Sequence, residues 1–249
     1  MKLKVLGSSS KGNCYILSSP TGSLVIEAGL PWKIIQKGLE FKLSNVVGAI
    51  LSHEHKDHSG AVLDVIKAGV DCYMSSGTAY SLSLIPVPHR LHIVSDSEDP
   101  FVVGDFIIKP FAIQHDAIEP YGYFIIYKPT GEHTLFLTDS YYSKYVFAGL
   151  NYIMLECNYI KDTLDANIAA GLIDERMKPR LLQSHFSLDH VIEFLQANDL
   201  SQCREIILLH LSSQNADSAR MIREIKEATG ITPKIAAPGL EVNLELYPY

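Results

Sequence analysis

Residues 52–60 read SHEHKDHSG, and they follow directly after the apolar stretch 46–51, VVGAIL. A polar stretch at the end of a strand is usually a solvated loop, but ligating side chains at this density are a poor fit to that interpretation. The stretch also differs from the HExxH motif of metalloproteases, because position 57 is Asp rather than His. The side chains that suit a metal ion are His53, His55, Asp57 and His58.

These four side chains form two pairs. In an extended segment His53 and His55 point to the same side, and a helix that begins near residues 57–59 brings Asp57 and His58 toward a second position. Imidazole and carboxylate ligands suit Zn²⁺, and also Fe or Mn. Two pairs suggest two divalent metal ions, which in two-metal sites lie roughly 3.5–4 Å apart and share ligands. Further ligands must therefore come from other parts of the chain.

Three candidates for these further ligands each end a predicted strand: His115, Asp139 and His210. Taken singly, each histidine is more often a hydrogen-bonded structural residue, and Asp139 could be a turn or cap residue. Together with the first stretch, the set predicts a metal centre. His185 is a further candidate, because it lies just before the predicted helix cap Ser187 and could bind a phosphate or protonate a leaving group.

Hydrophobic periodicity gives the coarse organisation of the chain. Short β-branched runs bounded by Gly, Ser or Pro predict strands within 2–7, 14–19, 24–29, 45–52, 72–76, 92–96, 100–113, 122–139, 151–157, 204–212, 234–238 and 240–247. Helical spacing predicts helices within 32–41, 59–69, 163–198 and 218–230. Two strand-rich stretches, each followed by helices, predict an α/β (α+β) protein, a four-layer αββα sandwich in one domain spanning residues 1–249.

Composition limits the classes of function. The chain has 249 residues, of which 47% are hydrophobic and 20% charged, as in ordinary globular proteins. Its net charge of −7 argues against non-specific binding to nucleic acid through a basic face. We expect no membrane partner, because no apolar run approaches the ~18–20 residues of a membrane helix. Four scattered cysteines without CxxC, and no signal-peptide pattern, predict free thiols in the cytoplasm.

The order H-x-H-x-D-H, then His, Asp and His, resembles the ligand series of the metallo-β-lactamase-fold superfamily. The resemblance runs from about Lys4 to Leu246 and implies the αββα sandwich of that family. It also implies how two metal ions are held. The first would be bound by His53, His55 and His115, the second by Asp57, His58 and His210, and Asp139 would bridge them.

Glu27 departs from the family pattern. The family usually has Asp at this point, in a turn after an early strand, and there the carboxylate orients the ligand loop. Glu27 is one methylene longer, which implies an adjusted orientation of the loop and weaker or altered metal binding. The alternative is that Glu27 is only a charged turn residue.

Several short motifs are similar to those of the YycJ-like branch, whose members are regarded as exonuclease-like phosphodiesterases. They are GSSSKGNCYIL, HDAIEPYGYFI, LTDS, LECNY, RLLQSHFSL and LLHLSSQN. In LECNY the pattern departs from the branch, since Ile160 and Lys161 stand where an acidic residue is common. The interval between Asp139 and His210 is too short for the cap domain of the RNA-processing β-CASP enzymes.

The resemblance implies a metal-dependent hydrolase that cleaves phosphodiester bonds of nucleic acid with a hydroxide shared by two metal ions. Asp57 or Asp139 would orient that hydroxide. Two alternatives remain open: hydrolysis of a small thioester, lactone or cyclic phosphodiester, and a non-catalytic metal-binding protein. Residues 7–13, GSSSKGN, are not a P-loop, but they could lend backbone N–H groups and Lys11 to a phosphate or could form a surface hairpin turn.

Overall fold

The computed structural model describes residues 1–245. Contacts within the chain divide it into two compact units. The first unit comprises Met1–Ala112, Ala117–Gly131 and the segment from Ala236 onward, and the second comprises Ile113–Asp116 and Glu132–Ile235. The single domain expected over residues 1–249 stays a prediction, and each unit is described by itself.

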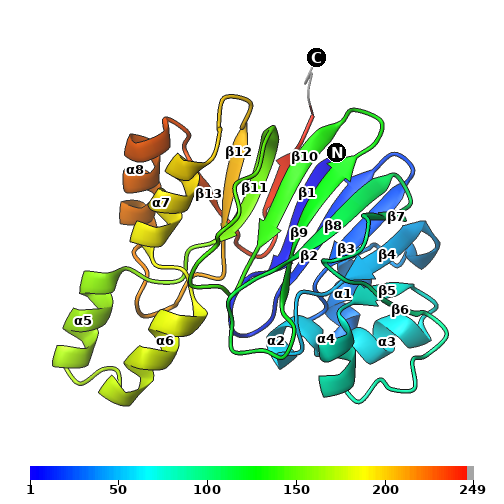
Figure 1. Ribbon diagram of the computed structural model, residues 1–249, viewed down its shortest axis with the longest axis horizontal. Coiled ribbons are helices and arrows are strands. Elements are labelled where there is room, and N and C mark those ends of the chain that lie inside the picture. The colour runs from blue at the N-terminus through cyan, green and yellow to red at the C-terminus, as the bar shows by residue number, and fades with distance from the viewer. Residues whose placement is uncertain (246–249) are drawn as a thin grey trace. The chain divides into compact units, whose positions relative to one another are not determined.

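The first unit contains a mixed sheet with the strand order β14-β1-β2-β3-β4-β5-β6 (Figure 1). Neighbours are antiparallel from β14 to β3 and parallel from β3 to β6. The apolar runs that predicted these strands become its inward faces. The strands are β1 Lys2–Gly7, β2 Cys14–Ser19, β3 Gly22–Ile26, β4 Val46–Ile50, β5 Cys72–Met74, β6 Leu91–Ile93 and β14 Glu241–Asn243.

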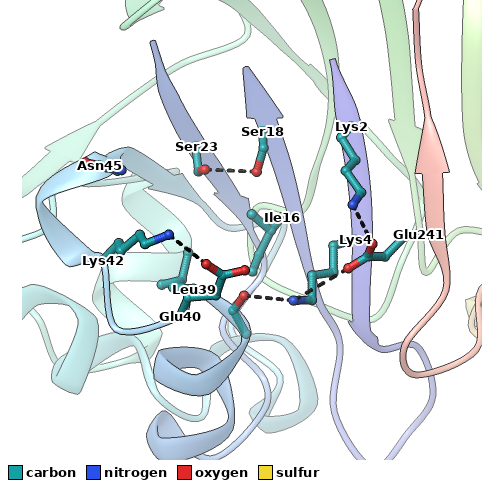
Figure 2. Close-up of a pocket in the computed structure, with 11 residues that line it drawn as sticks. Lys2, Lys4, Ile16, Ser18, Ser23, Leu39, Glu40, Lys42, Asn45 and Glu241 are labelled. Atoms are coloured by element: carbon teal, nitrogen blue, oxygen red, sulfur yellow. Dashed lines mark hydrogen bonds and ion pairs between the residues drawn. The ribbon is translucent and has the colours of Figure 1, made fainter. Parts of the chain in front are cut away.

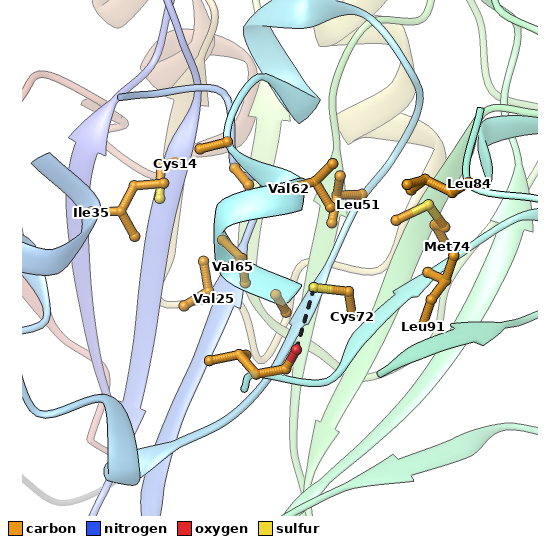
Figure 3. Close-up of a cluster of buried hydrophobic side chains, with 14 of the residues drawn as sticks. Cys14, Val25, Ile35, Leu51, Val62, Val65, Cys72, Met74, Leu84 and Leu91 are labelled. Carbon is orange, nitrogen blue, oxygen red and sulfur yellow. Dashed lines mark hydrogen bonds between the residues drawn. The ribbon is translucent and has the colours of Figure 1, made fainter. Parts of the chain in front are cut away.

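Short helices cover one face of this sheet. Figure 3 shows Val62 and Val65 of α3 among Val25, Leu51 and Cys72 from the strand side, in one cluster of buried side chains. The helix expected over 59–69 is divided into two, because the backbone N–H of Ala61 donates to the carbonyl of Ala28. The helices are α1 Trp32–Gly38, the 3₁₀ turn η1 Leu43–Asn45, α2 Lys56–Ser59, α3 Val62–Lys67 and α4 Ser76–Ser81.

A second layer of strands in the first unit packs on the opposite face of β4. These strands, β7 Phe101–Val103, β8 Phe106–Ala112 and β9 Tyr121–Tyr127, pair antiparallel. The hydroxyl of Tyr123 donates to the carbonyl of Leu51 over 2.5 Å, and a Cβ on Gly48 would lie 2.7 Å from a methyl group of Val103. The close approach of the layers therefore holds the end of β4, from which the histidine-rich segment leaves.

The second unit contains parallel strands in the order β13-β12-β11-β10. Every residue of β11 is buried. Parallel strands end at the same edge of a sheet, so the residues that follow β10, β11 and β12 lie together there. The strands are β10 Glu132–Leu137, β11 Leu150–Glu156, β12 Glu205–Leu209 and β13 Lys234–Ile235.

The helices of the second unit agree with the helical region expected over 163–198 and with the amphipathic helix expected over 218–230. Ser187 caps α7 as predicted, because its hydroxyl accepts a hydrogen bond from the N–H of His190. The helices α7 and α8 pack against each other. The helical elements are α5 Lys161–Ala169, η2 Glu175–Met177, α6 Lys178–Ser184, α7 Leu188–Ala197 and α8 Ser218–Thr229.

Candidate metal centre

The histidine-rich segment of the first unit gathers three imidazole rings after β4. The ring centroids of His53 and His55 lie 4.7 Å apart, and those of His53 and His58 lie 4.2 Å apart. The helix α2 begins at Lys56, one residue before the expected start, and it carries Asp57 and His58 in its only turn. The Oδ2 atom of Asp57 lies 3.4 Å from Nε2 of His58. All four predicted ligands of this segment are therefore close neighbours.

Glu27 orients this segment from β3. Its side chain is fully buried, which excludes the alternative of a charged turn residue. One carboxylate oxygen accepts a hydrogen bond from the N–H of Ser52 over 3.1 Å, and the other lies 3.4 Å from Nδ1 of His58. The hydroxyl of Ser52 in turn lies 2.8 Å from Nδ1 of His53. A buried carboxylate that fixes histidine rings in this way is a common support of metal ligands.

Asn13 is a second support of this segment, and no local sequence pattern predicts it. Its backbone N–H donates to the carbonyl of Asp57 over 2.7 Å, and its side-chain amide donates to the same carbonyl over 3.2 Å. The amide nitrogen also lies 3.1 Å from Nε2 of His58. Asn13 is the last residue of the GSSSKGN stretch, so that stretch is more than a surface hairpin turn.

In the second unit, residues at the ends of three parallel strands form a compact cluster with His185. Ligand atoms of Asp139, Glu156, His185 and His210 all lie within 4.8 Å of one another. Nδ1 of His210 lies 3.0 Å from Oδ1 of Asp139. This cluster joins two predicted metal ligands to His185, the residue expected to act on the substrate.

Glu156 is the member of this cluster that the sequence analysis did not select. It ends the wholly buried strand β11 and is itself fully buried. Its Oε1 lies 2.6 Å from Nδ1 of His185 and 3.2 Å from Nδ1 of His210. Its Oε2 accepts hydrogen bonds from the backbone N–H groups of Ser140 and Phe186. A carboxylate that ends an otherwise apolar run, LNYIMLE, is the signal that could have identified it.

His115 lies in the same unit, and its side chain is almost fully buried. Its Nδ1 lies 3.0 Å from the carbonyl oxygen of Ser184, so this nitrogen carries the proton that the carbonyl accepts. Its Nε2 lies 3.6 Å from Oδ2 of Asp139 and 3.3 Å from Oδ1 of Asp116. The Nε2 atom is thus directed at carboxylate oxygens, as expected for a ring nitrogen of a ligand site.

Backbone strain occurs at three of these buried polar residues. Glu27, Asp139 and His210 have φ angles of 65°, 47° and 52°, in the left-handed region that residues other than glycine rarely adopt. Each residue follows directly or closely after a strand. Such strain concentrates at functional sites, where the surrounding structure holds the residue in place. The conformation turns each side chain away from the direction that the strand would give it.

The electrostatics of the second-unit cluster follow from burial and charge. Burial raises the pKa of Glu156, but the charges and hydrogen bonds of His185 and His210 outweigh it and hold the pKa below its ordinary value. Burial lowers the pKa of His185, but Glu156 outweighs this effect and raises it. Burial lowers the pKa of His115, and the nearby carboxylates offset only part of that shift. Glu156 is therefore an anion that stabilises charge on the neighbouring rings.

The donor atoms present in each unit fit divalent metal ions. The first unit supplies three imidazoles and the carboxylate of Asp57, and the second supplies imidazoles and two buried carboxylates that lie within coordination reach of each other. Imidazole and carboxylate are the ligand types of Zn²⁺, Fe and Mn sites. The way in which individual residues share metal ions stays a prediction.

Comparison with known proteins shows which family part of the chain resembles. Residues 9–110, which contain most of the GSSSKGN stretch and the whole histidine-rich segment, match the family model described as metallo-beta-lactamase superfamily. This part of the chain is therefore similar to the metallo-β-lactamase superfamily. The family resemblance of the motif is thereby confirmed.

Two bacterial relatives are similar to nearly the whole chain, beyond the residues that the family model matches. The chain is 26% identical over 261 aligned positions to "Exodeoxyribonuclease WalJ" of Streptococcus pneumoniae, covering 99% of this chain and 93% of the relative. It is 25% identical to "Exodeoxyribonuclease YycJ" of Bacillus anthracis, covering 92% of this chain and 90% of the relative. The resemblance to the YycJ-like branch is confirmed by these matches.

Solved structures confirm the fold. The metallo-beta-lactamase fold protein YhfI from Bacillus subtilis has a TM-score of 0.73 at 16% identity, covering 97% of this chain and 98% of that chain. Yeast PDE1 has a TM-score of 0.71 at 12% identity, covering 96% of this chain and 98% of that chain. The predicted αββα metallo-β-lactamase fold is therefore correct. Within residues 1–245, every helix is too short or too polar to cross a membrane.

Proposed function

We propose that this metallo-β-lactamase protein is a metal-dependent hydrolase that cleaves phosphodiester bonds of nucleic acid, acting as an exonuclease. The observation that carries the proposal is similarity along nearly the whole chain to two proteins named exodeoxyribonuclease. The clusters of imidazole and carboxylate groups supply the metal ligands that such a hydrolase needs.

The proposed centre holds two divalent ions, with Zn²⁺ favoured and Mn or Fe as alternatives. His53, His55 and His115 would hold one ion, Asp57, His58 and His210 would hold the other, and Asp139 would be shared between them. When bound, such ions lower the pKa of water toward neutrality and stabilise charge on phosphoryl oxygens. The cationic ions also offset the net charge of −7 where the anionic substrate binds.

The protein's own residues position these ligands. Glu27 and Asn13 hold His58 and the backbone of Asp57 through the contacts of the first unit. In the second unit, Glu156 holds His185 through Nδ1, so the Nε2 edge of that ring is directed away from the carboxylate. His185 is the least buried of the second-unit cluster, with 17% of its side chain exposed. We assign it to the substrate, where Nε2 donates a proton to the leaving oxygen or a hydrogen bond to a phosphate.

The activity is tested by digestion of end-labelled single- and double-stranded DNA and RNA with Mn²⁺ or Zn²⁺. The wild-type protein is expected to shorten the labelled strand stepwise, and Asp57→Ala is expected to abolish the shortening. Asp99→Ala is the matched control, because Asp99 is an exposed aspartate remote in sequence from the ligands. It should leave the rate unchanged.

One outcome would contradict the proposal. A wild-type protein shown to hold two metal ions, yet unable to shorten any of the four substrates, is not a nuclease. The same preparation would then be assayed on cyclic phosphodiesters, thioesters and lactones, the alternative substrates of this fold.

We also propose that the protein acts in the cytoplasm. Within residues 1–245 all four cysteines are free thiols, and Cys14, Cys72 and Cys157 are buried. Free thiols are typical of a reducing compartment. Fractionation of cells that express the tagged protein tests this location.

A further inference from the structure

A pocket of about 380 Å³ opens beside the histidine-rich segment of the first unit. We call it the Lys11–Lys56 pocket. Its volume falls in the range of sites that hold small molecules or single nucleotide units. Asp57, a proposed metal ligand, forms part of its wall, so the pocket adjoins the centre. It is lined by Ser10, Lys11, Gly29, Leu30, Pro31, Trp32, Lys56, Asp57, Gly60, Ala61 and Asp64.

Both lysines of this pocket are exposed, and neither ammonium group has an ion-pair partner among residues 1–245. They come from separate segments, the GSSSKGN stretch and the first residue of α2. Asp64 is the carboxylate in the lining that is not a proposed ligand. Once the charge of Asp57 is matched by a metal ion, the lining carries a net positive charge, which favours a phosphate.

A second pocket of the same unit shows the opposite arrangement of its lysines. Figure 2 shows Lys2 and Lys4 directed at Glu241, and Lys42 directed at Glu40. Lys4 also donates to the carbonyl of Gly38. Each of these ammonium groups already contacts a carboxylate, with Glu241 shared by Lys2 and Lys4, so less of their charge is available to an anion. Lys11 and Lys56 differ from them because both are exposed and neither contacts a carboxylate among residues 1–245.

The walls of the Lys11–Lys56 pocket are held in place by the same backbone contacts that position Asp57. The N–H of Asn13 donates to the carbonyl of Asp57, and the N–H of Gly29 donates to the carbonyl of Asn13. The N–H of Ala28 donates to the carbonyl of His58, and the N–H of Ala61 donates to the carbonyl of Ala28. The pocket is therefore preorganised together with the metal ligands, which lowers the ordering cost of binding.

Trp32 is the single tryptophan of the chain. It is half-buried, packs against the hydrophobic cluster of the first unit, and lines the pocket. A flat aromatic side chain that is fixed by core packing and faces a cationic pocket suits the stacking of a nucleobase. An uncharged aliphatic ligand would make no favourable electrostatic contact with the two lysines.

We propose that the Lys11–Lys56 pocket binds one nucleotide of the substrate strand next to the cleaved bond. Lys11 and Lys56 bind its phosphate, and Trp32 stacks on its base. This inference rests on the proposed function, since it assigns the substrate to the same site. It gives the GSSSKGN stretch a role in substrate binding in addition to its support of Asp57.

The fluorescence of Trp32 reports on the pocket directly, because no other tryptophan contributes. The probe is a five-residue oligothymidylate with phosphorothioate linkages, which resist hydrolysis. Titration is expected to quench the fluorescence. In Lys11→Ala and Lys56→Ala, affinity should fall several-fold, and the slope of log affinity against log salt concentration should decrease by about 0.7, the value per phosphate contact on a single strand.

Matched controls are available on α1. Lys33 and Lys37 are exposed lysines of the same unit that do not line the pocket. Lys33→Ala and Lys37→Ala should therefore keep the wild-type affinity and salt slope.

The role of the Trp32 ring is tested with a fluorescently labelled form of the same oligonucleotide and measurement of anisotropy. Trp32→Leu keeps an apolar contact with the core but removes the flat ring, and it should weaken binding roughly five- to a hundredfold. Trp32→Phe keeps a smaller aromatic surface and should restore part of the affinity. Equal affinity of Trp32→Leu and wild type would exclude stacking.

The outcomes separate this inference from the proposed function. If the protein cleaves oligonucleotides but shows no quenching, and both lysine variants keep normal affinity, the role of the pocket is contradicted and the proposed nuclease activity is supported. If quenching occurs and both lysine variants weaken it, but the protein cleaves nothing, the role of the pocket is supported and the proposed nuclease activity is contradicted. Thymidine monophosphate that binds as tightly as the five-residue strand overturns the assignment to a substrate strand.

Discussion

Glu156 and His185 are joined by a contact of 2.6 Å between Oε1 and Nδ1, although 29 residues separate them in the chain. The same oxygen lies 3.2 Å from Nδ1 of His210. The other oxygen accepts the N–H groups of Ser140 and Phe186. One fully buried carboxylate therefore orients two imidazole rings and fixes the backbone that follows Asp139 and the backbone that follows His185.

Glu156→Gln is expected to weaken metal binding. The amide keeps the size of the side chain but replaces one acceptor oxygen with a donor, so it cannot accept from both histidines and both backbone N–H groups. Loss of such an orienting group typically lowers metal affinity or activity about 10–100-fold. Competition with a chelator measures the affinity, and Glu193→Gln on the exposed face of α7 is the control. Wild-type affinity in Glu156→Gln would show that Glu156 has no part in the centre.

Glu27→Asp is expected to destabilise the protein, even though Asp is the residue that the family usually has there. Shortening the side chain by one methylene, roughly 1.5 Å, moves the carboxylate away from the N–H of Ser52 and from the ring of His58. The loss of these buried contacts should lower the free energy of unfolding by roughly 1–2 kcal/mol and weaken metal binding. Glu27→Gln keeps the length and should retain the Ser52 contact. Denaturant unfolding compares the variants, and wild-type stability in Glu27→Asp would mean that the loop adjusts to the shorter side chain.

The candidate ligands of the first unit are recognisable in the sequence because they lie within six consecutive residues. Their chemistry and spacing are visible without knowledge of the fold. Glu156 could not be found in this way, since its partners His185 and His210 lie 29 and 54 residues away. Asn13 is 44 residues from Asp57. Its role depends on a loop contact that no local pattern encodes.

The secondary structure likewise includes elements that local patterns predict and elements that they do not. Apolar runs such as that of β11 predicted the strands, because burial on both faces leaves a clear signal. The helix α4 was missed, since residues 76–81, SGTAYS, have no amphipathic pattern, and α4 begins because the hydroxyl of Ser75 accepts the N–H of Thr78. The parallel order of β10 to β13 also lies beyond local patterns. It depends on the crossover connections between the strands, which hold helices between β11 and β12 and between β12 and β13.

Glu119 gives a prediction for acid stability. Burial raises its pKa, but hydrogen bonds from the N–H of Gly77 and the hydroxyls of Tyr121 and Ser76 outweigh this and lower the pKa below 4.5. A folded-state pKa below the unfolded value stabilises the protein above pH 4.5, and this contribution is lost as the pH falls through the folded-state pKa.

Glu119→Gln should therefore lower the melting temperature at neutral pH, and its difference from wild type should shrink as the pH falls from 5 toward about 3. The effect is modest, at most about 1 kcal/mol, because solvent screens a carboxylate that is partly exposed. Thermal unfolding across this pH range measures it. A difference that stays constant with pH would mean that the charge of Glu119 does not contribute.

Gly29→Ala is expected to disrupt the metal segment. A Cβ on Gly29 would lie 1.6 Å from the carbonyl oxygen of Asp57 and 2.8 Å from the backbone nitrogen of His58. Both atoms belong to the backbone, so no side-chain rotation relieves the overlap, and the segment itself must move. We expect a loss of about 3 kcal/mol in the free energy of unfolding, the upper end of overpacking costs.

Gly171→Ala is the matched control for this substitution. Gly171 has a φ of 71°, but a Cβ there would meet nothing within 4 Å. Its replacement should cost about 1 kcal/mol of backbone strain and leave metal affinity unchanged. Gly29→Ala should lose metal affinity even where circular dichroism shows that the variant is folded, because Asp57 and His58 are the residues displaced. Equal metal affinity in the two variants would show that the ligand segment tolerates displacement, and the tight contact between Gly29 and Asp57 would then have no role in positioning the ligands.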